Sequence, residues 1–142
     1  MTTLLSIINA LIFILLGAIH FYWGIGGKWG SIQALPQNLS NGTPLFIPSI
    51  VACFAVALGL WAMAIVTLNQ VGLMYLNLPN IFNQYCLYAI GSIFLLRALG
   101  DFKYVGFFKS IKNTEFGRMD TQFYSPLCLY LGITSLLIKI LN

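Results

Sequence analysis

The sequence contains few charged residues: seven Lys and Arg and three Asp and Glu make up 7% of its 142 residues. An ordinary soluble domain carries roughly 25% charged residues, whereas this chain is 59% hydrophobic and has a mean hydropathy of +0.88. So few charges could not cover a globular surface with solvated side chains. The composition therefore excludes a soluble enzyme, a disordered tail and a nucleic-acid-binding domain, although the net charge is +4. We expect residues 1–142 to form one integral membrane domain.

Histidine and cysteine are scarce as well, and this excludes several chemistries. One His and three carboxylates, with no two at ligand spacing on one helix, do not provide a metal site, so we expect neither metal nor cofactor. Cys53, Cys86 and Cys128 stand singly on three expected helices, and no C-x-x-C motif indicates thiol–disulfide exchange. No Asp or Glu lies in the middle of an apolar stretch, which argues against a carboxylate-based proton-coupled transporter.

Long apolar stretches dominate what is present. A membrane-spanning helix needs about 20 predominantly apolar residues, and four segments meet that length: residues 4–23, 45–68, 81–100 and 123–141. The sequence thus predicts an all-α fold, a bundle of four transmembrane helices. Thr43-Pro44 and Ser125-Pro126 each predict a helix start, with an N-cap residue followed by Pro at the first helical position. The first segment lacks a basic n-region and a small-residue cleavage pattern, so we interpret it as a retained span.

The cations are distributed unevenly over the predicted loops. Loops 24–43 and 101–122 share one membrane face and, with Arg97 at the adjoining helix end, hold six of the seven: Lys28, Arg97, Lys103, Lys109, Lys112 and Arg118. Only Lys139 lies at the opposite face, with the termini. Because Lys and Arg accumulate on the cytoplasmic side of membrane proteins, we expect the two long loops in the cytoplasm and both termini outside.

One loop has a pattern of its own. Tyr104, Phe107, Phe108 and Ile111 are spaced i, i+3, i+4 and i+7, which would place them on one face of a helix. The spacing predicts a short amphipathic helix between the third and fourth spans, lying in the interface with lysines near anionic head groups.

Residues that could carry chemistry gather at the predicted cytoplasmic face. Arg97 and Asp101 are spaced i, i+4, so they would form an ion pair if the third helix continues through Gly100. His20 could act as a general acid or base, or as an interhelical hydrogen-bonding group. The full candidate cluster is His20, Tyr22, Trp23, Trp29, Arg97, Asp101, Asp120 and Tyr124. Ordinary interfacial anchoring by an aromatic belt and a snorkelling arginine would look similar.

Three blocks of sequence, taken together, carry a resemblance: residues 20–30 (HFYWGIGGKWG), 97–109 (RALGDFKYVGFFK) and 120–128 (DTQFYSPLC). In these blocks the chain resembles a family of small bacterial four-helix integral membrane proteins catalogued as a domain of unknown function (family 3995). The resemblance implies a multi-pass protein of the bacterial inner membrane. It brings no assigned activity and no catalytic residues.

We weigh three functions against these residues. In the first, the cluster binds a small anionic or lipid head-group ligand: Arg97 holds the anion, Asp101 orients Arg97, His20 exchanges a proton, and Trp23 and Trp29 wall the site. In the second, the protein is a non-enzymatic scaffold or accessory subunit whose 104–111 face docks on lipid or on a membrane-protein partner. The third is a small oligomeric transporter, for which residues 49–67 supply little polar lining. No combination of residues identifies a particular reaction.

Overall fold

The computed structural model describes all residues, 1–142, and contains helices and turns but no strand. The elements are α1 (Thr2–Gly24), α2 (Ser31–Ala34), α3 (Ile50–Gln70), α4 (Asn80–Leu99), α5 (Glu115–Met119), a π-helical turn η1 (Asp120–Tyr124) and α6 (Ser125–Leu141). The all-α prediction is confirmed.

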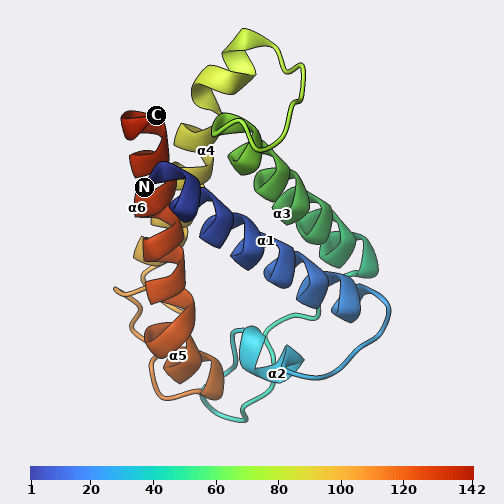
Figure 1. Cartoon of the computed structure of the whole chain (residues 1–142). Helices are drawn as coiled ribbons and strands as arrows, with labels where there is room; N and C mark the ends of the chain where they lie inside the picture. Colours follow the sequence, from blue (N-terminus) through green and yellow to red (C-terminus); the bar gives the residue numbers. More distant parts are fainter.

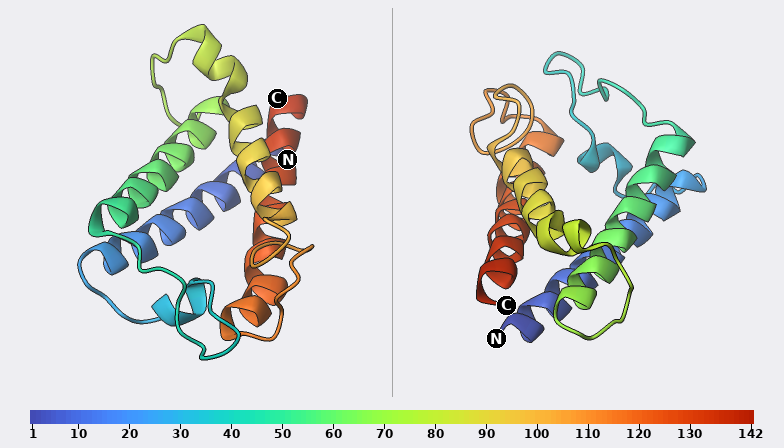
Figure 2. Two further views of the ribbon diagram at one scale, coloured as in Figure 1. Left: turned by 180° about the vertical axis from the view of Figure 1, so that it is seen from behind. Right: turned by 90° about the horizontal axis from the view of Figure 1, so that it is seen from above.

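The long helices form two pairs, α1 with α3 and α4 with α6 (Figure 1). Both pairs meet near the end of the molecule that holds the two termini, and they diverge toward the other end (Figure 2). The 71–79 connection lies at the end with the termini (Figure 1). We call the opposite end, where the two helix pairs are farthest apart, the wide end; it holds α2, α5 and the two long loops. Successive long helices therefore run in alternating directions, as the predicted order of spans requires.

The meeting point of the two pairs is partly polar. Asn9 of α1 is fully buried, and its side-chain amide donates to the hydroxyl of Thr134 of α6 at 2.9 Å. Thr134 in turn donates to the carbonyl of Tyr130 at 2.7 Å. Around this bond pack Phe13, Leu131 and other members of the apolar core. Interhelical hydrogen bonds and small residues, rather than bulk hydrophobicity, are what associate helices in lipid.

Three helices are long and apolar enough to cross a membrane: Thr2–Gly24, Ile50–Gln70 and the continuous Glu115–Leu141. The α4 helix is not among them. It is 20 residues long but carries Asn80, Asn83 and Gln84 at its start and Arg97 in its last turn. Three spans are thus supported by length and composition, not the four that the sequence analysis expects.

The second long helix begins later than predicted. Its N-cap is Ser49, whose hydroxyl accepts the N–H of Ala52 at 3.2 Å, and Ile50 is its first residue. Thr43-Pro44 instead belongs to a hairpin-like turn, in which Pro44 bridges to Gln37. Pro48 explains the delay, because proline disfavours the helical conformation of the residue before it.

The last span also departs from the expected start. Thr114 caps the helix by accepting the N–H of Gly117 at 3.0 Å, nine residues before the predicted position 123. The helix then continues through η1 into α6, so Ser125 and Pro126 lie within a continuous helical segment rather than at its start. A π-turn next to a proline accommodates the missing backbone N–H without ending the helix.

The predicted interfacial helix over residues 104–111 does not form. These residues adopt turns and bends, and the short helix between α4 and α6 is α5 instead. Two local features oppose a helix here. Gly106 has a positive φ of 89°, and Asp101 bonds to the backbone N–H groups that follow it, which competes with helical bonding.

Close packing of α4 on α6 predicts a sensitivity to side-chain size at Gly132. A Cβ there would lie 2.7 Å from Leu95 Cγ and 3.1 Å from its backbone nitrogen. Gly132→Val is therefore expected to destabilise the protein by about 1–3 kcal/mol through overpacking, measured by thermal unfolding in detergent micelles. The control is Gly59→Val on α3, where nothing lies within 4 Å. Equal midpoints for the two variants would contradict the packing described.

Candidate functional site

A buried carboxylate organises the wide end of the molecule. Asp120 is fully buried and accepts four hydrogen bonds. Oδ1 accepts from Arg97 Nη2 at 2.8 Å. Oδ2 accepts from Lys109 Nζ at 2.9 Å, from Gly106 N at 2.8 Å and from the Ser125 hydroxyl at 3.0 Å. Charge-assisted bonds of this kind are stronger than neutral ones. We call these five residues the Asp120 cluster.

The Asp120 cluster uses only part of the hydrogen-bonding capacity of Arg97. Its side chain is 33% exposed, and the Nη1 nitrogen is buried with no hydrogen-bond partner. An arginine has no acceptor capacity and five N–H donors in a planar fork, so Nη1 presents donors without a protein acceptor. The cluster also contains two cations for one carboxylate, and therefore carries a net charge of +1.

Asp101 is not the partner of Arg97, contrary to the i, i+4 prediction. The α4 helix ends at Leu99, and Gly100 follows with a positive φ of 86°, so the two side chains do not share a helical face. Asp101 Oδ1 instead accepts the backbone N–H groups of Lys103, Tyr104 and Val105 at 2.7–2.9 Å. Slight burial raises the pKa of Asp101, but these N–H groups outweigh it and lower the pKa below its ordinary value.

Sequence reasoning missed the role of Lys109. Its side chain is fully buried, and Nζ donates both to Asp120 and to the Gly106 carbonyl at 2.9 Å. The interfacial-helix pattern assigned this lysine to the lipid head groups. The one available signal was the rarity of acidic residues, since only three carboxylates are present for all seven Lys and Arg. Ser125 was missed too, because Ser-Pro reads as a helix cap.

His20 and Trp23 lie in a different place from the Asp120 cluster. His20 Nδ1 is 2.8 Å from the Leu16 carbonyl, and the His20 ring packs edge-on against Trp23 with centroids 5.1 Å apart. Both side chains line a pocket of about 620 Å³ between α1, α2, α3 and residues 44–48. Lys28 is the only charged residue in its wall.

The other aromatic candidates, Tyr22, Trp29 and Tyr124, make contacts that hold turns and helices of the protein together. Tyr22 packs on Gly27 in the turn after α1, and Trp29 is 76% exposed while its carbonyl accepts from Trp23 Nε1 at 2.8 Å. The Tyr124 hydroxyl donates to the Gln33 carbonyl of α2 at 3.4 Å. The predicted single cluster is thus divided: His20, Tyr22, Trp23 and Trp29 lie around the end of α1, whereas Arg97, Asp120 and Tyr124 lie around α4 and α6.

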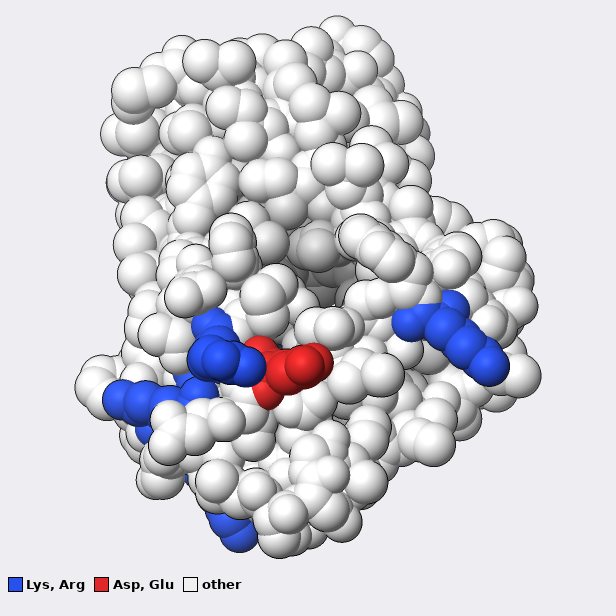
Figure 3. All heavy atoms as spheres, turned by 90° about the horizontal axis from the view of Figure 1, so that it is seen from below, with Lys and Arg blue, Asp and Glu red and all other residues white.

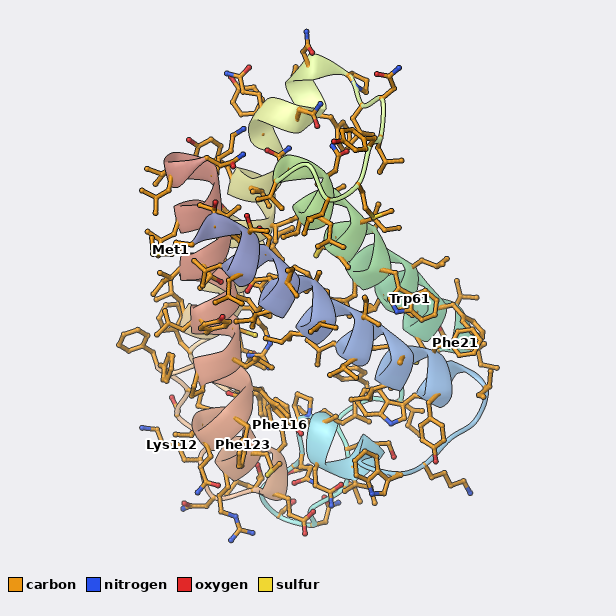
Figure 4. The ribbon with its side chains drawn as sticks, in the orientation of Figure 1. Met1, Phe21, Trp61, Lys112, Phe116 and Phe123 are labelled. Atoms are coloured by element: carbon orange, nitrogen blue, oxygen red, sulfur yellow. The ribbon has the colours of Figure 1, made fainter.

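The α2 segment separates the two groups. Ser31, Ile32, Ala34 and Leu35 line the pocket on one side, while Gln33 from the same turn contacts Glu115 and Tyr124. Phe116 of α5 is buried beside α2 (Figure 4), where its N–H donates to the Gln37 side chain at 3.4 Å. Seen from the wide end, basic atoms lie on both sides of a central acidic patch, next to a hollow (Figure 3).

Residues 13–135 match the family described as Protein of unknown function (DUF3995). The chain belongs to this family. The matched region includes the pocket around His20 and the whole Asp120 cluster, so both sites lie in the part of the chain that the DUF3995 family shares. Searches of the curated proteins and of the solved structures find no match to the chain.

Removing the charge of Asp120 should strongly destabilise the fold. Asp120→Asn leaves Arg97 and the fully buried Lys109 without a counter-charge, and uncompensated buried charges cost about 3–5 kcal/mol. The readout is the free energy of unfolding in micelles. Glu115→Gln, at an exposed carboxylate without an ion pair, is the control and should shift stability by less than about 0.5 kcal/mol. Adding Lys109→Met should recover part of the Asp120→Asn loss; a further loss would contradict the assigned pairing.

The loop after α4 should respond to acid through Asp101. Because folding lowers its pKa below the ordinary 3.8, its stabilisation is present above that value and is lost as pH falls through the lower folded value. We expect the amide resonances of Lys103, Tyr104 and Val105 to titrate together in NMR spectra, with a midpoint below 3.8. Asp101→Ala should abolish this titration. A midpoint above the ordinary value would show that the N–H bonds do not hold the carboxylate.

Proposed function

We propose that the protein is a multi-pass protein of the bacterial inner membrane in which α4 forms a fourth span. A helix of 20 residues is about 30 Å long, which matches the hydrocarbon core. The strongly polar residues of α4 lie at its two ends, Asn80, Asn83 and Gln84 at one and Arg97 at the other, and the residues between them are uncharged, with Ser92 as the one hydroxyl residue besides the tyrosines. The excess of Lys and Arg at the wide end supports a cytoplasmic location for that end and an external location for both termini.

We further propose that the wide end binds an anionic group, the phosphate or carboxylate of a small ligand or lipid head group, at Arg97. The observation that carries this proposal is the buried Nη1 nitrogen of Arg97, which has no acceptor in the protein. Asp120 holds the other side of the guanidinium through Nη2 and so fixes its orientation, the role that the sequence analysis gives to Asp101. A planar, oriented guanidinium suits two-point recognition of an oxyanion.

Charge favours the same class of ligand. The only ion pairs in the structure are those of Asp120 with Arg97 and Lys109, and Lys109 already neutralises this carboxylate in part. An anion that displaces the atoms covering Nη1 would therefore meet a net positive cluster rather than a balanced ion pair. His20, placed in the separate pocket, has no part in this site.

The test is calorimetric titration of the full chain in an uncharged detergent, with inorganic phosphate and dihexanoyl phosphatidate as probes. Saturable binding is expected, and Arg97→Gln should weaken it about tenfold or more, the effect of one charge-assisted hydrogen bond. Tighter binding of phosphatidate would identify a lipid head group as the ligand, and equal binding would identify the free anion.

Two variants separate binding from folding. Arg97→Lys keeps a cation beside Asp120 but loses the fork, so we expect near-normal stability with weakened binding. Arg118→Gln removes an exposed arginine that has no ion pair and should leave binding unchanged. Absence of saturable binding, or equal losses in Arg97→Gln and Arg118→Gln, would contradict the proposal.

An accessory-subunit function retains one specific observation in its favour. Although the 104–111 helix is absent, Phe102 and Phe108 are 65% and 62% exposed and lie together on the loop, with ring centroids 6.4 Å apart. Such a pair could insert into the interface or dock on a partner. Phe108→Asp should then reduce recovery of a crosslinked partner from native membranes without altering phosphate binding.

A further inference from the structure

The pocket at the end of α1 has the composition of a binding site for an amphiphile. Its volume of about 620 Å³ is typical of small-molecule sites. Nine of its fifteen lining residues are hydrophobic, among them Ile32, Leu35, Phe46 and Val56. The polar groups are few and include one cation, Lys28, and one imidazole, His20. No acidic residue lines the pocket.

The structure holds Lys28 at the pocket without neutralising it. The Lys28 carbonyl accepts from both the backbone N–H and the hydroxyl of Ser31, at 3.3 and 2.8 Å, so the backbone of this lysine is fixed. Its ammonium has no ion pair, because the three carboxylates are engaged elsewhere. Asp120 binds Arg97 and Lys109, and the other two, Asp101 and Glu115, bond to the 103–105 loop backbone and to Gln33.

The walls of the pocket are braced independently of any ligand. Trp23 Nε1 closes the turn after α1 by donating to the Trp29 carbonyl. On the other side, Leu45 N donates to the Pro36 carbonyl at 2.8 Å, and the buried Gln37 side chain ties this hairpin to α2 and α5. His20 Nδ1 lies 2.8 Å from the Leu16 carbonyl, an oxygen that can only accept, so this nitrogen donates and holds the ring in place.

We propose that this pocket binds the hydrocarbon chain of an anionic amphiphile, a fatty acid or an anionic phospholipid, with its head group on Lys28. The apolar walls take the chain, the unpaired ammonium takes the negative charge, and a long apolar ligand without charge would leave Lys28 unused. The site uses none of the residues of the Asp120 cluster. An experiment that contradicts the anion site at Arg97 would therefore not contradict this pocket, and the reverse also holds.

Trp23, which lines the pocket, can report occupancy. The chain has three Trp, and in a Trp29→Phe/Trp61→Phe background only Trp23 remains; its bond to residue 29 goes to the backbone and is preserved. The full chain in an uncharged detergent is titrated with dibromostearate, its methyl ester, and brominated phosphatidylglycerol and phosphatidylcholine. Bromine on a bound chain quenches the Trp23 fluorescence.

We expect saturable quenching by an anionic probe and binding about tenfold weaker for its counterpart without net charge, the methyl ester or the zwitterionic phosphatidylcholine, because a charge-assisted contact is lost or offset. If dibromostearate binds more tightly than phosphatidylglycerol, the ligand is a free fatty acid; the reverse order identifies a phospholipid. Lys28→Gln should remove the preference for the anionic probe, while Lys112→Gln, at an exposed lysine outside the pocket, should not.

A matched pair of alanines on α3 tests the position of the chain. Ala52 lines the pocket and Ala55 does not, and both are exposed. Ala52→Phe should abolish saturable quenching, whereas Ala55→Phe should leave it intact. Linear quenching of equal size by acid and ester, or insensitivity to both Ala52→Phe and Lys28→Gln, would overturn the proposal by showing only partitioning into the micelle. Arg97→Gln should have no effect on this quenching, which distinguishes the two sites.

Discussion

The wide end of the molecule depends on one carboxylate that is removed from solvent. Asp120 connects the last turn of α4 through Arg97, the following loop through Gly106 and Lys109, and the start of α6 through Ser125. A carboxylate in a low-dielectric site is costly unless it is paired and hydrogen-bonded. Because four donors from three segments meet it, the loop between α4 and α6 cannot move away without exposing an unpaired charge. This constraint fixes the position of Arg97.

The topology could be predicted from the sequence because it depends on quantities that the sequence contains directly. Helix length and continuous hydrophobicity locate the apolar middle of each long helix, and the positions of Lys and Arg separate one end from the other. Helix starts were less predictable. Thr43 and Ser125 have the residue types of caps, but Ser49 and Thr114 perform that role, since the conformation beyond a proline and the continuation through a π-turn depend on tertiary contacts.

The partner of Arg97 shows where sequence reasoning reaches its limit. The i, i+4 rule selects Asp101 only if the helix continues, and the positive φ of Gly100 ends it one residue too early. Asp120, more than twenty residues away, becomes the partner because α6 packs against α4. The same packing buries Lys109, which no local pattern distinguishes from the exposed Lys103. Long-range pairing of this kind requires the three-dimensional arrangement of helices, which a single sequence does not specify.

The scarcity of acidic residues then has a consequence for both candidate sites. Six of the seven Lys and Arg and all three carboxylates lie toward the wide end, and each carboxylate is engaged within the protein. One of them is shared by two cations, and the other two bind neutral groups. The positive charge of Lys28, Lys103, Lys112 and Arg118 therefore has no counterpart in the chain itself. If this end faces an anionic leaflet, as we propose, each basic residue near the head groups would contribute about 1 kcal/mol of attraction. The same charge imbalance would then favour the proposed orientation of the protein and attract anions toward the two proposed sites on either side of α2.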